Sequence, residues 1–129
     1  MAVTHSTASR DAATNAVTAL IGASGRARFR LAGTVGAPGT SVANLGLSAT
    51  AFGASATGTA TAAAITSDTA AAGNATAVAT FTLETSGGVV VIHCAVAASA
   101  SDVNLSNGLT INAGDTVSMS SLTYTALIA

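Results

Sequence analysis

The spacing of apolar and polar residues changes once along this chain, near Gly25. Before that point, residues 6–21 are helical in pattern, with Ser6 as the expected N-cap and Gly22 as the C-terminal stop. The apolar positions of this stretch recur at helical spacing: Ala13, Val17, Leu20 and Ile21. Because this stripe is narrow, the helix is expected to lie against another surface rather than to stand alone.

After Gly25 the period becomes two, and Gly, Asn, Ser and Asp separate the stretches that are expected to be strands. These stretches are 26–32, 40–48, 57–66, 75–85, 89–97, 103–111 and 116–126. The pattern predicts a mainly β fold, an antiparallel β-sandwich or jelly roll of about seven to eight strands with one N-terminal helix. We therefore expect an N-terminal arm and helix over residues 1–22 and a single β-sandwich domain over 23–129.

The stretch 89–97, VVVIHCAVA, is apolar on both faces and predicts a central, buried strand. Cys94 is interpreted as a small buried apolar side chain, and His93 as a hydrogen-bonded strand residue. Adjacent strand residues point to opposite faces, so these two side chains do not form a catalytic dyad by themselves.

Composition points to an assembly component. Charged residues make up 7% of the chain, aromatic residues 3%, and the formal net charge is −1. Such a surface has no strong field to attract nucleic acid or an anionic membrane, so neither is expected as a partner. A near-zero net charge favours association, and a core rich in Ala gains little free energy from burial. We expect neighbouring molecules to supply the missing buried surface.

No constellation for catalysis is evident in the sequence. The usual nucleophile and nucleotide-binding motifs do not occur, and no His, Cys or acidic cluster has metal-ligand spacing. Asp68, Asp102 and Asp115 follow Ser or Gly in turn-like contexts, which predicts that they cap turns. We expect a protein that is not an enzyme, with no cofactor, no metal and no small-molecule substrate.

Three of the four basic residues fall in the short run GRARFRLAG, at Arg26, Arg28 and Arg30. The alternation predicts a first strand with Phe29 and Leu31 toward the core and all three arginines facing out. Two interpretations of this stripe stay open: a solvated strand face, or a docking surface for an acidic partner.

Three segments carry a resemblance to a known class of protein. They are VTHSTASRDAAT, FGASATGTATAAAITSDTAAAGNATAVATFTL and INAGDTVSMSSLTYTA. Together they resemble capsid cement (decoration) proteins of tailed bacteriophages, of the kind found on a Bordetella phage head. The resemblance implies a jelly-roll or β-sandwich body on the outside of an icosahedral shell, in contact with several major capsid protein subunits. It implies no catalytic residues.

From this resemblance we expect a virion protein on the outer capsid surface, made in the cytoplasm of the bacterial host, that stabilises the shell against the pressure of packaged DNA. The expected partners are the major capsid protein and a second copy of the chain, with a homodimer favoured and a trimer as the alternative. The residues expected to contact the capsid or a partner are Arg26, Arg28, Arg30, Val17, Leu20 and Ile21. The alternative function is a phage tail or fibre component, or a receptor-binding β-sandwich module.

Overall fold

One helix and eight strands follow one another in the computed structural model, which describes residues 3–127. They are α1 (Thr7–Ile21), β1 (Arg26–Arg30), β2 (Ser41–Leu47), β3 (Thr59–Thr61), β4 (Ile65–Thr66), β5 (Thr80–Glu84), β6 (Val90–Ala97), β7 (Val103–Asn104) and β8 (Thr123–Thr125). The expectation of a mainly β, sandwich-like fold with one N-terminal helix is confirmed.

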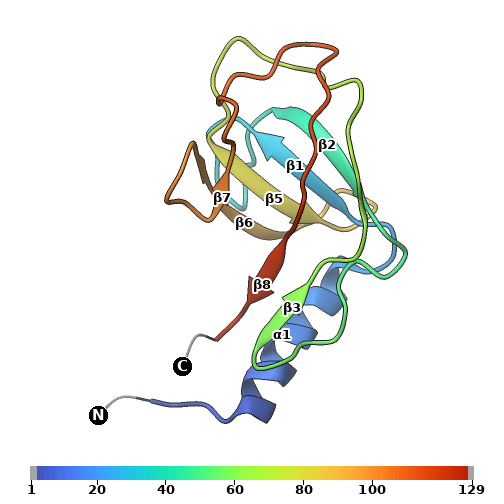
Figure 1. Cartoon of the computed structure of the whole chain (residues 1–129), viewed down its shortest axis with the longest axis vertical. Helices are drawn as coiled ribbons and strands as arrows, with labels where there is room; N and C mark the ends of the chain where they lie inside the picture. Colours follow the sequence, from blue (N-terminus) through green and yellow to red (C-terminus); the bar gives the residue numbers. More distant parts are fainter. Residues whose placement is uncertain (1–2, 128–129) are drawn as a thin grey trace.

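The elements form two lobes, which we call the head and the stalk (Figure 1). The head is a six-stranded sheet in the order β4-β2-β1-β5-β6-β7, antiparallel except for the β6–β7 pair. The stalk consists of α1 and the two-stranded antiparallel sheet β3–β8. It therefore joins three distant parts of the chain, and the first and last described segments lie at this lobe (Figure 1).

The ends of α1 agree with the sequence prediction. The Ser6 hydroxyl accepts a hydrogen bond from the Ser9 backbone N–H at 3.2 Å, and Gly22 ends the helix with φ at +70°. This left-handed conformation favours glycine, because a Cβ would be strained there. Local capping signals thus set the helix boundaries.

The predicted apolar stripe of α1 is only partly the packed side of the helix. Ile21 is buried as part of it, but Ala13 and Val17 are half-buried, Leu20 is 65% exposed, and the other buried residues are Thr14 and Thr18. The Thr14 hydroxyl donates to the Gly58 carbonyl at 2.6 Å and accepts from the Ala126 N–H at 3.1 Å, which ties α1 to the segments carrying β3 and β8. Because these hydroxyls have partners, a threonine face can be buried without the cost of an unsatisfied polar group.

The central strand of the head is β5, not the stretch 89–97. All five residues of β5 are buried, because β1 and β6 flank it on both sides. Strand β6 is mostly half-buried, since β7 pairs only with its last two residues, at Val96 and Ala97. The prediction for 89–97 failed because apolar residues on both faces do not reveal how much of a strand is paired on its second side.

The two faces of the head sheet differ in chemistry. One, the apolar face, carries Ala27, Phe29, Leu45, Phe81 and Leu83, which cross-strand pairing places side by side. The rings of Phe29 and Phe81 pack edge to face, with centroids 5.1 Å apart. The other, the polar face, carries the three arginines, Thr82 and Glu84.

Residues 103–122 pack over the apolar face, but the strands predicted at 103–111 and 116–126 form over only a small part of each stretch. Only Val103–Asn104 and Thr123–Thr125 are strands in these stretches. The remaining residues bond to scattered loop positions; for example, Leu109 accepts from the Val78 N–H and Ile111 accepts from the Asn74 N–H. Isolated bonds of this kind position a segment without a continuous ladder.

The predicted strand 57–66 is likewise divided. Its first part is β3, which pairs with β8 in the stalk, and its last part is β4, at the edge of the head sheet. Between them, Ala62 and Ala63 donate to Leu122 and Ala51, respectively. One short stretch of chain thus links the two lobes.

The stalk meets the head at Gly25. A Cβ atom on this residue would lie 2.4 Å from Ile21 Cγ2 and 2.7 Å from the Glu84 carbonyl oxygen. Only glycine therefore lets the end of α1 approach the end of β5, where Ile21 is 1% exposed.

We predict that Gly25→Ala lowers the free energy of unfolding by about 1–3 kcal/mol, the usual cost of overpacking, as measured by urea denaturation. Gly36→Ala is the matched control, because a Cβ at Gly36 meets nothing within 4 Å. Equal stability of the two variants would contradict this description of the junction.

Candidate partner-binding surfaces

The arginine run does not face outward as a whole. Arg30 is 8% exposed and is part of the protein interior, whereas Arg26 and Arg28 are half-buried. The alternation correctly placed all three on the face opposite Phe29. It could not show that this polar face is itself covered, so the expectation of three solvent-facing arginines is wrong for Arg30.

Arg30 is held by a buried ion pair with Glu84. Its Nη2 lies 2.9 Å from Glu84 Oε2, and its Nε donates both to that oxygen, at 3.2 Å, and to Thr82 Oγ1, at 3.1 Å. Its Nη1 donates to the Gly39 carbonyl at 2.7 Å. The Thr82 hydroxyl donates to the same carboxylate oxygen. The guanidinium thus joins β1, β5 and the loop that precedes β2.

Two register shifts accompany this pair. One lies between Phe29 and Arg30 in the β1–β2 pairing, and the other lies between Leu83 and Glu84 in the β5–β6 pairing. A bulge re-aims the side chain beside it. We infer that the two shifts help a charge on β1 to reach a carboxylate on β5 that is not its direct cross-strand partner.

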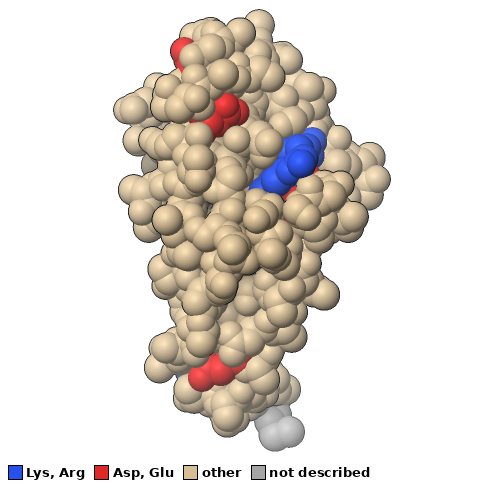
Figure 2. All heavy atoms as spheres, turned by 90° about the vertical axis from the view of Figure 1, so that its right-hand side faces the viewer, with Lys and Arg blue, Asp and Glu red and all other residues tan. Residues whose placement is uncertain are grey.

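Arg28 completes the cluster from its outer side. Its Nη1 lies 3.7 Å from Glu84 Oε1, and its Nε donates to Asn44 Oδ1 at 3.4 Å. The Glu84 side chain is fully buried, whereas that of Arg28 is 20% exposed. The guanidinium groups of Arg28 and Arg30 flank one carboxylate, and Arg26 lies on the same face. The cluster therefore has a local excess of positive charge on a largely uncharged surface (Figure 2). The docking hypothesis is therefore confined to Arg26 and Arg28.

The three expected contact residues of α1 have different surroundings. Leu20 is exposed and Val17 is half-buried, so a partner can contact most of the Leu20 side chain and part of the Val17 side chain. Ile21 is 1% exposed and packs against the junction at Gly25. The expectation that Ile21 contacts a partner is wrong, because its side chain already belongs to the core.

An exposed apolar ridge on α1 was missed from the sequence. Its members follow one another at every fourth position, and all are exposed: Ala8, Ala12, Ala16 and Leu20. We call this set the α1 ridge. Positions four apart lie on neighbouring turns of the same helix surface. The spacing was present in the sequence, but threonine was not expected to take the buried side.

The turn-capping role is confirmed for Asp68 and Asp115. Asp68 accepts from the Ala70 N–H at 3.0 Å, and Asp115 accepts from the Asn112 N–H at 2.8 Å. Asp102 instead accepts from the Ala95 N–H of β6, at 3.1 Å. It therefore fastens a loop to a strand rather than capping its own turn.

Asp11 has a structural role that the sequence did not indicate. Its Oδ1 accepts from the Gly58 N–H at 2.7 Å and from the Ser55 hydroxyl at 2.8 Å. These hydrogen bonds, that from Gly58 first, lower the pKa of the Asp11 carboxyl below its ordinary value. A lowered pKa stabilises the fold above the ordinary range of a carboxyl, and this contribution disappears as the pH falls through the folded-state pKa.

His93 and Cys94 point to opposite faces of β6, as expected. His93 lies opposite Thr82 on the polar face, and its Nε2 is buried without a hydrogen-bond partner among the described residues. Cys94 is half-buried on the apolar face, and burial followed by the charge of Asp102 raises the pKa of its thiol to about 11. The thiol is therefore protonated and unreactive near neutral pH.

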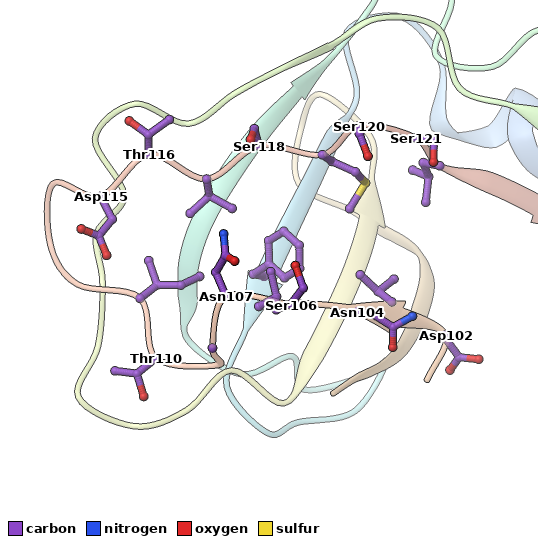
Figure 3. A pocket seen from close by; sticks show the side chains of 18 of the residues that line it. Asp102, Asn104, Ser106, Asn107, Thr110, Asp115, Thr116, Ser118, Ser120 and Ser121 are labelled. Carbon is purple, nitrogen blue, oxygen red and sulfur yellow. The ribbon is translucent and has the colours of Figure 1, made fainter. Parts of the chain in front are cut away.

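A groove of about 620 Å³ crosses the layer formed by residues 103–122 (Figure 3). Of its apolar lining residues, Phe29, Val103, Ile111 and Val117 are buried beneath it, whereas Leu105, Met119 and Leu122 are half-buried and accessible from it. Hydroxyl and amide side chains follow its two walls: Asn104, Ser106, Asn107, Ser118, Ser120 and Ser121. Asp102 and Asp115 lie at its opposite ends (Figure 3).

Within residues 3–127, no group of three or more His, Cys, Asp or Glu side chains is arranged to hold a metal ion. In the same range, no helix is long and apolar enough to cross a membrane.

Comparison of the chain with models of protein families, with curated proteins and with solved structures finds no match. The surfaces described above are therefore interpreted from their own geometry and chemistry.

We predict that replacing one member of the buried pair lowers the free energy of unfolding strongly. Replacing both should lower it by less than the sum of the two single effects. Arg30→Met and Glu84→Met should each lower the free energy of unfolding by about 3–5 kcal/mol, because each leaves a buried charge without its partner. The double variant should lose clearly less than the sum, as measured in a double-mutant cycle by urea denaturation.

Arg26→Met serves as the control, since this half-buried residue lies on the same strand and face. It should change stability by no more than about 0.5 kcal/mol. Additive effects at Arg30 and Glu84 would contradict the buried pair.

Proposed function

We propose that this chain is a structural protein of a tailed-bacteriophage particle that binds the outside of the icosahedral capsid. There it cements neighbouring subunits of the major capsid protein and stabilises the shell against the pressure of the packaged DNA. The likeness of its sequence segments to capsid cement proteins first suggested this function. Support from the structure comes from the way α1 distributes its polar and apolar residues.

The observation that carries the proposal is that α1 buries two threonine side chains and exposes a row of apolar side chains. Helix α1 buries the hydroxyls of Thr14 and Thr18 and leaves its α1 ridge exposed. A surface helix ordinarily presents polar residues to water and apolar residues to the core. An outward ridge of small apolar side chains suits a helix that a second protein covers, because small side chains allow close approach of the two surfaces.

The division into head and stalk also favours a bridging role. The α1 ridge lies on the stalk, whereas Arg26 and Arg28 lie on the head. Two separated surfaces can engage two subunits at once, so that modest affinities multiply through effective concentration. Under this proposal the two arginines face acidic groups of the shell, and a second copy of the chain doubles the number of contacts.

The test is co-sedimentation of the purified chain with capsids of the phage that encodes it, stripped of their own copies. We predict that Ala12→Lys and Ala16→Lys together reduce occupancy at least about tenfold, because a covered apolar ridge would then bury two unpaired charges. Lysine is a good helix former, so α1 itself should persist, which circular dichroism can verify.

Ser86→Lys combined with Thr34→Lys is the matched control. Both positions are exposed in loops of the head, and the pair adds the same charge. The control should bind as the unaltered chain does. Absence of binding by the unaltered chain would refute the capsid role, and equal binding by all variants would refute the assignment of the α1 ridge.

A further inference from the structure

The groove on the head is bordered by two chain segments that bond away from it. On one wall, the Leu109 carbonyl accepts from the Val78 N–H at 2.8 Å, and the Ile111 carbonyl accepts from the Asn74 N–H at 2.9 Å. These bonds fasten the segment 103–111 to the chain on its outer side.

The opposite wall, residues 115–122, is fastened in the same way. Val117 exchanges two hydrogen bonds with Asp68, at 2.8 and 3.0 Å, and the Asp115 carbonyl accepts from the Ala71 N–H at 3.0 Å. Among the backbone hydrogen bonds of the described chain outside regular elements, only that from Asp115 to Asn112 joins the two walls, at the turn between them.

Each wall therefore has an inner edge. In an extended chain, the N–H and C=O groups of one residue point to one side of the strand, and those of the next residue point to the other side. Thr110 lies between two residues that bond outward, and so does Thr116. Their backbone groups consequently point toward the groove, which both residues line. The two edges face each other across the groove, which Leu105, Met119 and Leu122 also line, in the manner of two strands with the strand between them missing.

The charges of the groove restrict what fits there. Asp102 and Asp115 lie at opposite ends, and no basic residue is among those that line it (Figure 3). Both carboxylates are exposed and each accepts one backbone N–H, so both remain accessible to a second donor. A chain with a cation at each end complements this arrangement.

We propose that the groove binds an extended segment of a partner protein as an added strand between its two walls. The segment has apolar side chains at alternate positions, which face the half-buried Leu105, Met119 and Leu122, and a basic residue at each end. Backbone pairing supplies affinity, and these apolar side chains and the terminal carboxylates select the sequence, as in other cases of strand addition. This inference does not depend on the capsid role, because any partner with such a segment satisfies it.

The probe is the labelled peptide Arg-Thr-Val-Thr-Val-Thr-Arg, blocked at both ends, titrated into the full chain. We expect saturable binding by fluorescence anisotropy, with amide shifts in residues 104–120 in the NMR spectrum. The same peptide with glutamate at both ends should bind about tenfold more weakly, because attraction at two exposed carboxylates becomes repulsion. Proline at the central threonine should also weaken binding, because it removes a backbone N–H donor.

Three variants of the chain test where the peptide binds and which groups select it. Ser118→Trp places a large side chain on the groove wall and should abolish binding, whereas Ser86→Trp, on an exposed turn outside the groove, should leave it unchanged. Asp102→Asn with Asp115→Asn keeps the acceptor oxygens and should erase the preference for arginine over glutamate ends.

Three results would overturn the proposal. They are the absence of saturable binding by the arginine-ended peptide, binding that Ser118→Trp does not weaken, and shifts confined to residues outside the groove. Self-association of the unaltered chain, measured by sedimentation equilibrium and lost in Ser118→Trp, would instead assign the groove to a second copy. If the unaltered chain binds the peptide but does not bind the capsid, only the capsid role is refuted.

Discussion

The buried ion pair between Arg30 and Glu84 is the interaction on which the rest of the head depends. It joins the two inner strands β1 and β5, and the same guanidinium holds the loop before β2 through Gly39. The backbone carbonyl of Glu84 also borders Gly25, where the stalk meets the head. One residue thus contributes its side chain to the sheet and its backbone to the junction.

Such a pair defines an arrangement more than it adds net stability. Removing two charges from water costs free energy that their attraction only partly repays, so a buried pair is a weak source of stability. A broken pair is expensive, however, and alternative registers of β1 against β5 would break it. In a chain with few large apolar side chains, this cost disfavours misaligned sheets.

The small number of large apolar side chains also explains how the stalk packs. Thr14 and Thr18 fill the interface of α1 because their hydroxyls find partners at Gly58 and at the Thr14 carbonyl. The helix can then leave the α1 ridge on the outside. The orientation of α1 therefore has two consequences. Its buried hydroxyls have hydrogen-bond partners, and its exposed side carries apolar side chains.

Local signals in the sequence predicted the elements, and long-range contacts decided what they do. Ser6 and Gly22 define α1 because capping involves only neighbouring residues. The alternation around Phe29 identified β1 and its two faces. It could not reveal that Arg30 is buried, because the carboxylate that neutralises it is Glu84, distant in sequence. The segments around Leu109 and Val117 alternate like strands, yet their partners are isolated loop positions, and the groove between them has no sequence signature.

The most direct test of the buried pair is hydrogen exchange at the arginine side chains. The Arg30 Nε–H donates to both Thr82 and Glu84, whereas Arg26 lies half-buried on the same face. We predict that, in the NMR spectrum near neutral pH, the Arg30 Nε–H exchanges with water at least about a hundredfold more slowly than the Arg26 Nε–H, because a buried hydrogen bond must open before exchange. Equal, rapid exchange at both residues would contradict the buried pair and the account of the head built on it.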